Sequence, residues 1–301
     1  MSERDHRQRA EVAGRPAGRT FLKRDRSYTC HMNRTVGLVR GIGREMAMAF
    51  RHVSARSFPR YAIDIVLYRY MRVRVPKRAD ARRTIRLKNG VQLVYRLNRG
   101  DIQTVRAVWF QGTYRLPYDL PGDRGTLVDL GANIGLASVY LGRRYGFERL
   151  VAVEPLPENA ELARLNLAIN DISAEVVQAA VAPQAGQTTF VRANNHNSGL
   201  VAPQDGGLPV VLVTVDEIAP EPIRLVKLDI EGGEGPLLTA NTAWLDRTTG
   251  LIVEFHPAKI NYPGLAHEVR DQHSFMFYPP ASVYTYTTDG YLAARCLEPQ
   301  A

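Results

Sequence analysis

Residues 126–135 read Thr-Leu-Val-Asp-Leu-Gly-Ala-Asn-Ile-Gly, an apolar strand that runs into a turn containing glycine. A second apolar strand, Leu150-Val-Ala-Val-Glu154, ends on an acidic residue 23 positions after Gly131. Glycines at 131 and 135 let a strand turn sharply into a helix and let a ligand approach the backbone. A carboxylate at this distance can accept hydrogen bonds from both hydroxyls of a ribose. The pattern predicts a nucleotide-type pocket formed by two strand ends.

The turn also indicates which kind of nucleotide binds. Position 133 is Asn, so the Gly-x-Gly-x-x-Gly turn of the dehydrogenases that bind a diphosphate is absent. A Gly-x-x-x-Gly turn that follows Asp129 suits a ligand with a ribose but no diphosphate, and S-adenosylmethionine is the commonest such ligand. We therefore expect S-adenosyl-L-methionine as the cofactor, with Glu154 on its ribose.

Four segments together carry a resemblance to a known family. They occur in the order Val128–Gly135, Val153–Asn159, Val226–Glu234 and Ile252–His256, each at the end of an expected strand. The chain resembles the FkbM-type S-adenosylmethionine-dependent methyltransferases over roughly residues 84–300. The resemblance implies an α/β, Rossmann-like, doubly wound and mostly parallel seven-stranded sheet with a C-terminal antiparallel hairpin. It also implies methyl transfer to a hydroxyl of a sugar, polyketide or related metabolite.

The resemblance extends to individual residues of the cofactor pocket. It implies that Asp129, Gly131, Asn133 and Gly135 surround the methionine part of the cofactor. The third strand ends near Gln178, so the adenine is read either by this side chain or by the backbone alone. Asn159 either caps its helix or lies near the sugar.

The catalytic residues are expected where the fourth and fifth strands end. Asp229 and Glu231 are two positions apart, so they share a face on a continuing strand, and Glu254 and His256 repeat this spacing one strand over. His256 titrates near neutral pH, so it is either the base that removes the acceptor proton or the group that orients Glu254. Asp229 contacts the cofactor or the acceptor, because a carboxylate that ends an apolar strand needs a partner. The carboxylate cluster could also hold Mg²⁺ for a vicinal diol, but no ligand spacing demands a metal, so none is expected.

The remaining elements follow from periodicity. Residues 85–95 alternate on both sides of Asn89-Gly90, which predicts a β-hairpin. Asp101 to Phe110 is expected to be helical, and residues 283–292 are expected to form a hairpin that turns at Asp289-Gly290. Between them we expect strands at 126–130, 150–154, 175–180, 210–214, 225–230 and 251–255, and helices at 135–145, 157–169 and 235–246.

Charge separates the first 83 residues from the rest. Residues 1–83 contain 21 Lys+Arg and 7 Asp+Glu, whereas residues 84–301 contain 18 and 23. We therefore expect a basic N-terminal extension over 1–83, disordered over 1–31 and helical over 35–58 and 60–75, followed by the methyltransferase domain over 84–301. The extension could touch anionic lipid.

Composition narrows the compartment and the acceptor. Two cysteines cannot form a disulfide framework, and neither a secretory signal nor a membrane span is evident, so a cytoplasmic location is expected. The catalytic domain is mildly acidic, so we expect a small-molecule or glycan hydroxyl as the acceptor rather than a nucleic acid. Two alternatives stay open: an RNA methyltransferase that uses the basic arm, and a noncatalytic nucleotide-binding module.

Overall fold

The computed structural model describes residues 26–70, 80–97, 99–116, 119–120, 124–192, 199–201, 207–254, 275–278 and 291–296. By packing, the chain divides into two units, Met1–Gly41 and Ile42–Ala301. Helix α1 (Arg26–His52) begins in the first unit. Residues 26–31 are helical, so the predicted disorder is wrong for this stretch. Among the described helices, none combines the length and apolar character that a membrane span requires.

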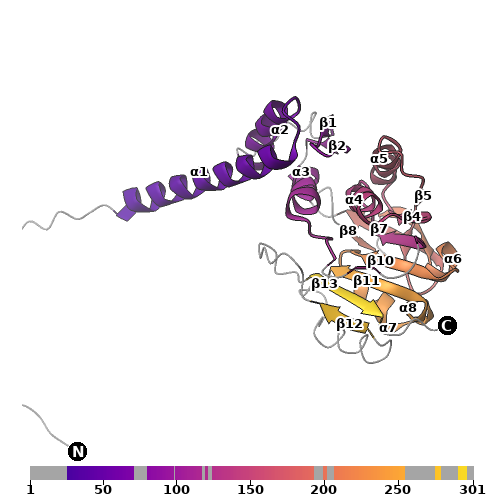
Figure 1. Ribbon diagram of the computed structural model, residues 1–301. Coiled ribbons are helices and arrows are strands. Elements are labelled where there is room, and N and C mark those ends of the chain that lie inside the picture. The colour runs from indigo at the N-terminus through magenta and orange to yellow at the C-terminus, as the bar shows by residue number, and fades with distance from the viewer. Residues whose placement is uncertain are drawn as a thin grey trace, which may run out of the picture. The chain divides into compact units, whose positions relative to one another are not determined.

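Within the described ranges, seven strands form the central sheet in the order β12-β13-β11-β10-β3-β4-β5 (Figure 1). All neighbours from β11 to β5 are parallel, whereas β13 is antiparallel to both β11 and β12. The predicted Rossmann-like fold with a mostly parallel sheet is confirmed, while the expected turn at Asp289-Gly290 lies outside the described residues. The strands are β3 (Thr126–Leu130), β4 (Arg149–Val153), β5 (Glu175–Val177), β10 (Ile223–Leu228), β11 (Thr248–Glu254), β12 (Phe275–Tyr278) and β13 (Tyr291–Cys296).

Helices cover both faces of the sheet, which is why its strands are apolar throughout. Two consecutive residues of β3 illustrate this, because Leu127 and Val128 belong to two different core clusters. The first cluster includes residues of α4 (Leu136–Tyr145) and α5 (Pro157–Ala168), and the second includes residues of α7 (Glu234–Thr239) and α8 (Ala243–Asp246) (Figure 1).

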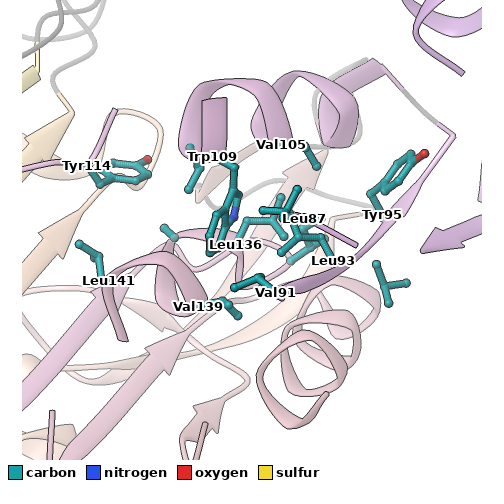
Figure 2. Packing of buried hydrophobic residues seen from close by; sticks show 14 of the residues in the cluster. Leu87, Val91, Leu93, Tyr95, Val105, Trp109, Tyr114, Leu136, Val139 and Leu141 are labelled. Atoms are coloured by element: carbon teal, nitrogen blue, oxygen red, sulfur yellow. The ribbon is translucent and has the colours of Figure 1, made fainter. Parts of the chain in front are cut away.

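Residues between α1 and β3 extend the first cluster. Buried side chains of α1, β2 and α3, such as Ala49, Leu93 and Ile102, pack into one core with residues of α4 and α5. Figure 2 shows part of this core, with Leu93 and Val105 near Leu136 of α4. The predicted hairpin is confirmed and turns at Gly90, whose φ is +89°. The domain boundary expected at residues 83 and 84 remains a prediction. The elements of this region are α2 (Phe58–Asp64), the π-helices η1 (Ile65–Tyr70) and η3 (Arg106–Gln111), β1 (Arg82–Arg86), β2 (Gln92–Arg96) and α3 (Arg99–Val105).

Side-chain amides of α5 fasten this hairpin to the domain. Asn166 accepts a hydrogen bond from the backbone N–H of Val94 (2.7 Å) and donates to its carbonyl (2.9 Å). Asn170 makes the same pair of bonds with Gln92, at 3.0 and 2.7 Å. The next outward N–H of β2, that of Arg96, is accepted by the Asp101 carboxylate at 2.8 Å. One edge of β2 is therefore occupied by side chains.

Three expected elements differ from the observed ones. The strand expected at 175–180 is divided between β5 and β6 (Ala180–Val181), and the strand expected at 210–214 is part of β9 (Leu208–Val213). β6 and β9 belong to a separate small sheet with β7 (Gly186–Arg192) and β8 (Gly199–Val201), in the order β6-β9-β7-β8, and α6 (Val215–Ile218) follows β9. The helix expected at 235–246 breaks into α7 and α8, because Asn241 has a positive φ of 55° and donates to the carbonyl of Pro183.

Candidate active site

The carboxyl end of β3 is the switch point of the central sheet. β4 and β5 lie on one side of β3, and β10 and β11 lie on the other. Ligands of doubly wound sheets bind outside the strand ends at such a point. Turn 131–135 follows β3, Glu154 follows β4 and Asp229 follows β10. The structure therefore brings these three predicted elements to one edge of the sheet.

The glycines of turn 131–135 are required by close packing as well as by the sharp turn. Gly131 and Gly135 both have a φ of 78°, a backbone conformation that favours glycine. A Cβ on Gly131 would lie 1.8 Å from the carbonyl oxygen of Asp229, and one on Gly135 would lie 2.9 Å from the Cα of Ala163 in α5. What these positions approach in the structure is protein, so their contact with a ligand remains a prediction.

The Glu154 carboxylate joins the turn to the start of α5. It is 5% exposed and accepts hydrogen bonds from the backbone N–H groups of Asn133 (2.9 Å) and Leu156 (3.0 Å) and from Asn159 Nδ2 (3.1 Å). Burial raises the pKa of Glu154 to about 7, and the three hydrogen bonds oppose this rise without cancelling it. Oε1 accepts two of these bonds and Oε2 only one, so the carboxylate can accept a further donor.

Two amide oxygens beside Glu154 lack donors. Oδ1 of Asn133 and Oδ1 of Asn159 are buried, and neither accepts a hydrogen bond from any residue in the described ranges. Buried polar atoms are nearly always hydrogen-bonded, so acceptors of this kind are suited to a ligand that brings donors. The side chain of Asn159 does not cap its helix, because its Nδ2 donates to Glu154. The residue is also buried, with 2% exposure.

Asp129 lies beneath the turn in a buried ionic cluster. It is fully buried, accepts a hydrogen bond from Ser138 Oγ (2.5 Å) and pairs with Lys227 Nζ at 3.1 Å. Lys227 is the register partner of Asp129 on β10 and also donates to the carbonyl of Gly131 at 2.7 Å. The predicted contact of Asp129 with the cofactor therefore stays a prediction, and the observed geometry shows Asp129 supporting the turn through Lys227.

Lys227 connects the two predicted aspartates. Its ammonium lies 3.6 Å from Asp229 Oδ2, and the lysine is 2% exposed. Burial alone would lower the pKa of Lys227, but the charges of Asp129 and Asp229 outweigh burial and hold this pKa above its ordinary value. The ammonium is therefore retained in the interior, where it interacts with both carboxylates.

Asp229 receives a hydrogen bond from a residue far away in the sequence. The hydroxyl of Tyr114 donates to Asp229 Oδ2 at 3.1 Å, and the Tyr114 ring lies with its centroid 5.5 Å from Lys227 Nζ. The Asp229 side chain retains 21% of its exposure, in contrast to the fully buried Asp129. Of the two aspartates, Asp229 is the one that a ligand can reach.

The segment after Asp229 is a tight turn. Glu231 has a φ of +57° and Gly232 a φ of +102°, so the chain does not continue as a strand and the shared face expected for Asp229 and Glu231 is not formed. Glu234 is fully buried and accepts a hydrogen bond from the backbone N–H of Ile230 at 3.0 Å. Glu234 therefore stabilises the turn and is also the first residue of α7.

The other predicted residues lie around this edge or beyond the described chain. Glu254 ends β11 and contributes to the electrostatic environment of Lys227. Gln178 is exposed and follows Val177, whose carbonyl accepts the Glu154 N–H at 3.0 Å. His256 lies outside the described residues. Among the described residues, no group of three or more His, Cys, Asp or Glu side chains is arranged to hold a metal ion.

Comparison with known families matches this site to one of them. Residues 129–277 match the model described as the methyltransferase FkbM domain. The chain therefore belongs to the FkbM methyltransferase family through these residues. The resemblance read from the four sequence segments is thereby confirmed, and the FkbM domain contains turn 131–135, Glu154, Lys227 and Asp229.

Three proteins similar to parts of the chain are described as methyltransferases or methylases. The "Methyltransferase sdnD" of Sordaria araneosa is 47% identical over 45 residues, which are 15% of this chain and only 17% of that protein. An rRNA methylase structure from Streptococcus thermophilus has a TM-score of 0.40 and 15% identity, covering 60% of this chain and 90% of that one. A precorrin-6y C5,15-methyltransferase structure from Geobacter metallireducens has a TM-score of 0.37 and 16% identity, covering 64% and 87%.

Three residues of the site were not predicted from the sequence. Lys227 could have been found, because a lysine within the apolar run of β10 must pair with an acid when it is buried. Ser138 gives no such signal, since a serine on a helix has many uses. Tyr114 lies outside the FkbM domain, and no local pattern indicates that it reaches Asp229.

Proposed function

We propose that this chain is an S-adenosylmethionine-dependent methyltransferase that methylates a hydroxyl group of a sugar, a glycan or a small metabolite. The observation that carries the proposal is the acceptor-rich environment of Glu154 at the switch point. A buried carboxylate with capacity for another donor is bonded by Asn133 and Asn159, and the side-chain amide oxygens of these two residues are buried and without donors in the described chain. A ribose diol supplies donors of this kind, so the residues fit the cofactor.

The proposed cofactor contacts are divided among three elements. Glu154 holds the ribose, turn 131–135 with Asn133 holds the methionine part, and Gln178 or the neighbouring backbone borders the adenine. Asp129 acts indirectly, because it is fully buried and fixes Lys227, which in turn holds the carbonyl of Gly131. When bound, the cofactor supplies a methyl group on a positively charged sulfur.

The chain's own contribution to the reaction is to align the acceptor and remove its proton. Alignment of reacting groups accounts for several kcal/mol of a barrier, and a well-placed base adds roughly 10²–10⁴-fold. The base is proposed from Asp229, Glu231, Glu254 and His256. Asp229 is supported by its partial exposure at the end of β10. The acceptor class rests on the family resemblance.

An RNA acceptor is the second candidate, favoured by the charge of the N-terminal region. Within residues 42–64, Arg44, Arg51, Arg56 and Arg60 are all exposed, whereas the two acidic residues, Glu45 and Asp64, are buried. An exposed basic surface binds phosphate backbones without sequence preference. This surface belongs to a part of the chain outside the FkbM domain.

Two measurements test the proposal. In a thermal-shift assay, S-adenosylhomocysteine at a hundred times its Kd should stabilise the protein by about 2.7 kcal/mol, whereas NAD should not. Absence of a shift with S-adenosylhomocysteine refutes the proposal. Transfer of a tritium-labelled methyl group into extracted glycans and metabolites, but not into RNA, supports a hydroxyl acceptor, whereas labelled RNA supports the second candidate. Binding without any transfer indicates a noncatalytic module.

A further inference from the structure

Tyr114 comes from a rigid segment that the FkbM domain does not include. η3 ends at Gly112 in a left-handed conformation, and the Thr113 N–H and hydroxyl both bond the carbonyl of Ala107, at 3.1 and 2.9 Å. On the other side of Tyr114, the Leu116 N–H donates to the hydroxyl of Tyr145 at 2.8 Å. The backbone that carries Tyr114 is therefore fixed on both sides.

The Tyr114 side chain is equally constrained. Tyr114 belongs to the hydrophobic cluster that includes residues of α4 (Figure 2), and the residue is 6% exposed. Its hydroxyl donates to Asp229 Oδ2. Apolar packing thus fixes the orientation of the ring, and this orientation fixes the position of the phenolic oxygen. A donor held in this way is preorganised, so it can orient a carboxylate without further loss of side-chain entropy.

Asp229 has two competing partners on one oxygen. Tyr114 Oη lies 3.1 Å from Asp229 Oδ2, and Lys227 Nζ lies 3.6 Å from the same atom. The lysine distance is longer than a direct hydrogen bond, so the tyrosine bond is the shorter of the two. Without the hydroxyl, the carboxylate is free to close the remaining distance and form a direct salt bridge with Lys227. This movement would turn Asp229 toward the interior.

We propose that Tyr114 is a positioning residue for Asp229. By donating to Oδ2, it keeps the carboxylate from collapsing onto Lys227 and leaves Oδ1 directed to the ligand side of the sheet edge. The inference rests on the proposed function, because it requires that Asp229 contacts the bound cofactor. It goes beyond the FkbM domain, because it assigns a role at the site to a segment N-terminal to the matched residues.

The test compares Tyr114→Phe with Tyr140→Phe in the full chain. Both variants remove one hydroxyl from the same aromatic region, but Tyr140 contacts Trp109 through its ring. Among the described residues, the tyrosine that donates to Asp229 is Tyr114 and not Tyr140. S-adenosylhomocysteine affinity is measured by calorimetry, and the melting temperature of the ligand-free protein is measured alongside. We expect Tyr114→Phe to weaken binding about tenfold with an unchanged or raised melting temperature, because the new ion pair replaces the lost bond. Tyr140→Phe should bind as the wild type does.

A double-mutant cycle with Asp229→Asn separates positioning from a general structural effect. Once the charge on residue 229 is removed, its attraction to Lys227 is lost, so Tyr114→Phe should then change affinity less than twofold. Equal tenfold losses in both backgrounds overturn the inference, as does wild-type affinity in Tyr114→Phe. A fall in affinity that simply follows a lowered melting temperature also overturns it. If the wild type itself does not bind S-adenosylhomocysteine, the proposed function fails first and the inference with it.

Discussion

Replacing Glu154 with Gln is expected to remove a pH dependence of stability that the buried carboxylate creates. The pKa of Glu154 is raised from 4.5 to about 7 in the folded chain, chiefly by burial. Between these pH values the folded protein holds a proton that the unfolded chain has released. The contribution of Glu154 to stability is therefore fully present below the unfolded pKa and is lost as the pH rises through about 7.

The size of this effect follows from the shift. Each unit of pKa difference corresponds to 1.36 kcal/mol, so the full shift is about 3 kcal/mol, of which about 2–3 kcal/mol is lost between pH 5 and pH 8. Urea unfolding of the ligand-free protein at a series of pH values measures it. The difference in unfolding free energy between wild type and Glu154→Gln should change by this amount across the range, because the amide does not titrate.

Two further observations decide whether the reasoning holds. Glu161→Gln, on the exposed part of the same helix, is the matched control and should follow the wild-type curve at every pH. Ribose hydroxyls donate to the ionised carboxylate, so S-adenosylhomocysteine should bind the wild type roughly tenfold more weakly at pH 6 than at pH 8. Parallel stability curves for wild type and Glu154→Gln would refute the assignment of a raised pKa to Glu154.

Three other substitutions have defined outcomes, each measured by chemical denaturation. Gly131→Ala should lower the free energy of unfolding by more than about 3 kcal/mol, because its Cβ would meet the Asp229 carbonyl. Gly90→Ala is the control, since Gly90 also has a positive φ but lies in open space, and it should lower this free energy by about 1–2 kcal/mol. Similar losses for the two variants would contradict the packing argument. Lys227→Met should cost about 3–5 kcal/mol, since it leaves Asp129 buried without a cation, and adding Asp129→Asn should recover part of the loss. Asn166→Ala should lower the free energy of unfolding by about 3 kcal/mol or more, because the N–H and carbonyl of Val94 and the carbonyl of Ile134 lose their hydrogen-bond partner. A loss below about 1 kcal/mol would show that other groups replace Asn166.

The sequence predicted the parts of the site that depend on local pattern. Gly131, Gly135 and Glu154 lie at strand ends, and a strand followed by a turn is encoded by neighbouring residues. Their meeting point at one edge then follows from the rules for parallel sheets. Glu231 shows the limit of local reasoning, because two residues of positive φ turn the chain where alternation was expected to continue.

The remaining features depend on contacts between distant residues. Tyr114 reaches Asp229 across 115 positions, and nothing in the residues around either one indicates this contact. β9 has the alternation of a strand whether it joins the central sheet or the small one, so its place depends on its partners β6 and β7. Lys227 and Asp129 are adjacent only because β10 and β3 pair in one register. Such pairings are set by the whole fold.

The side-chain amides along β2 have a consequence for association between molecules. A free strand edge presents unpaired backbone groups that can recruit a strand from another chain. Here Asn170, Asn166 and Asp101 accept the N–H groups of successive alternate residues on that edge. An incoming strand would have to displace bonds that also fasten the hairpin to α5. Intermolecular growth of this hairpin therefore requires its detachment from the asparagines of the α5 region, and these side chains protect the chain against assembly along that edge.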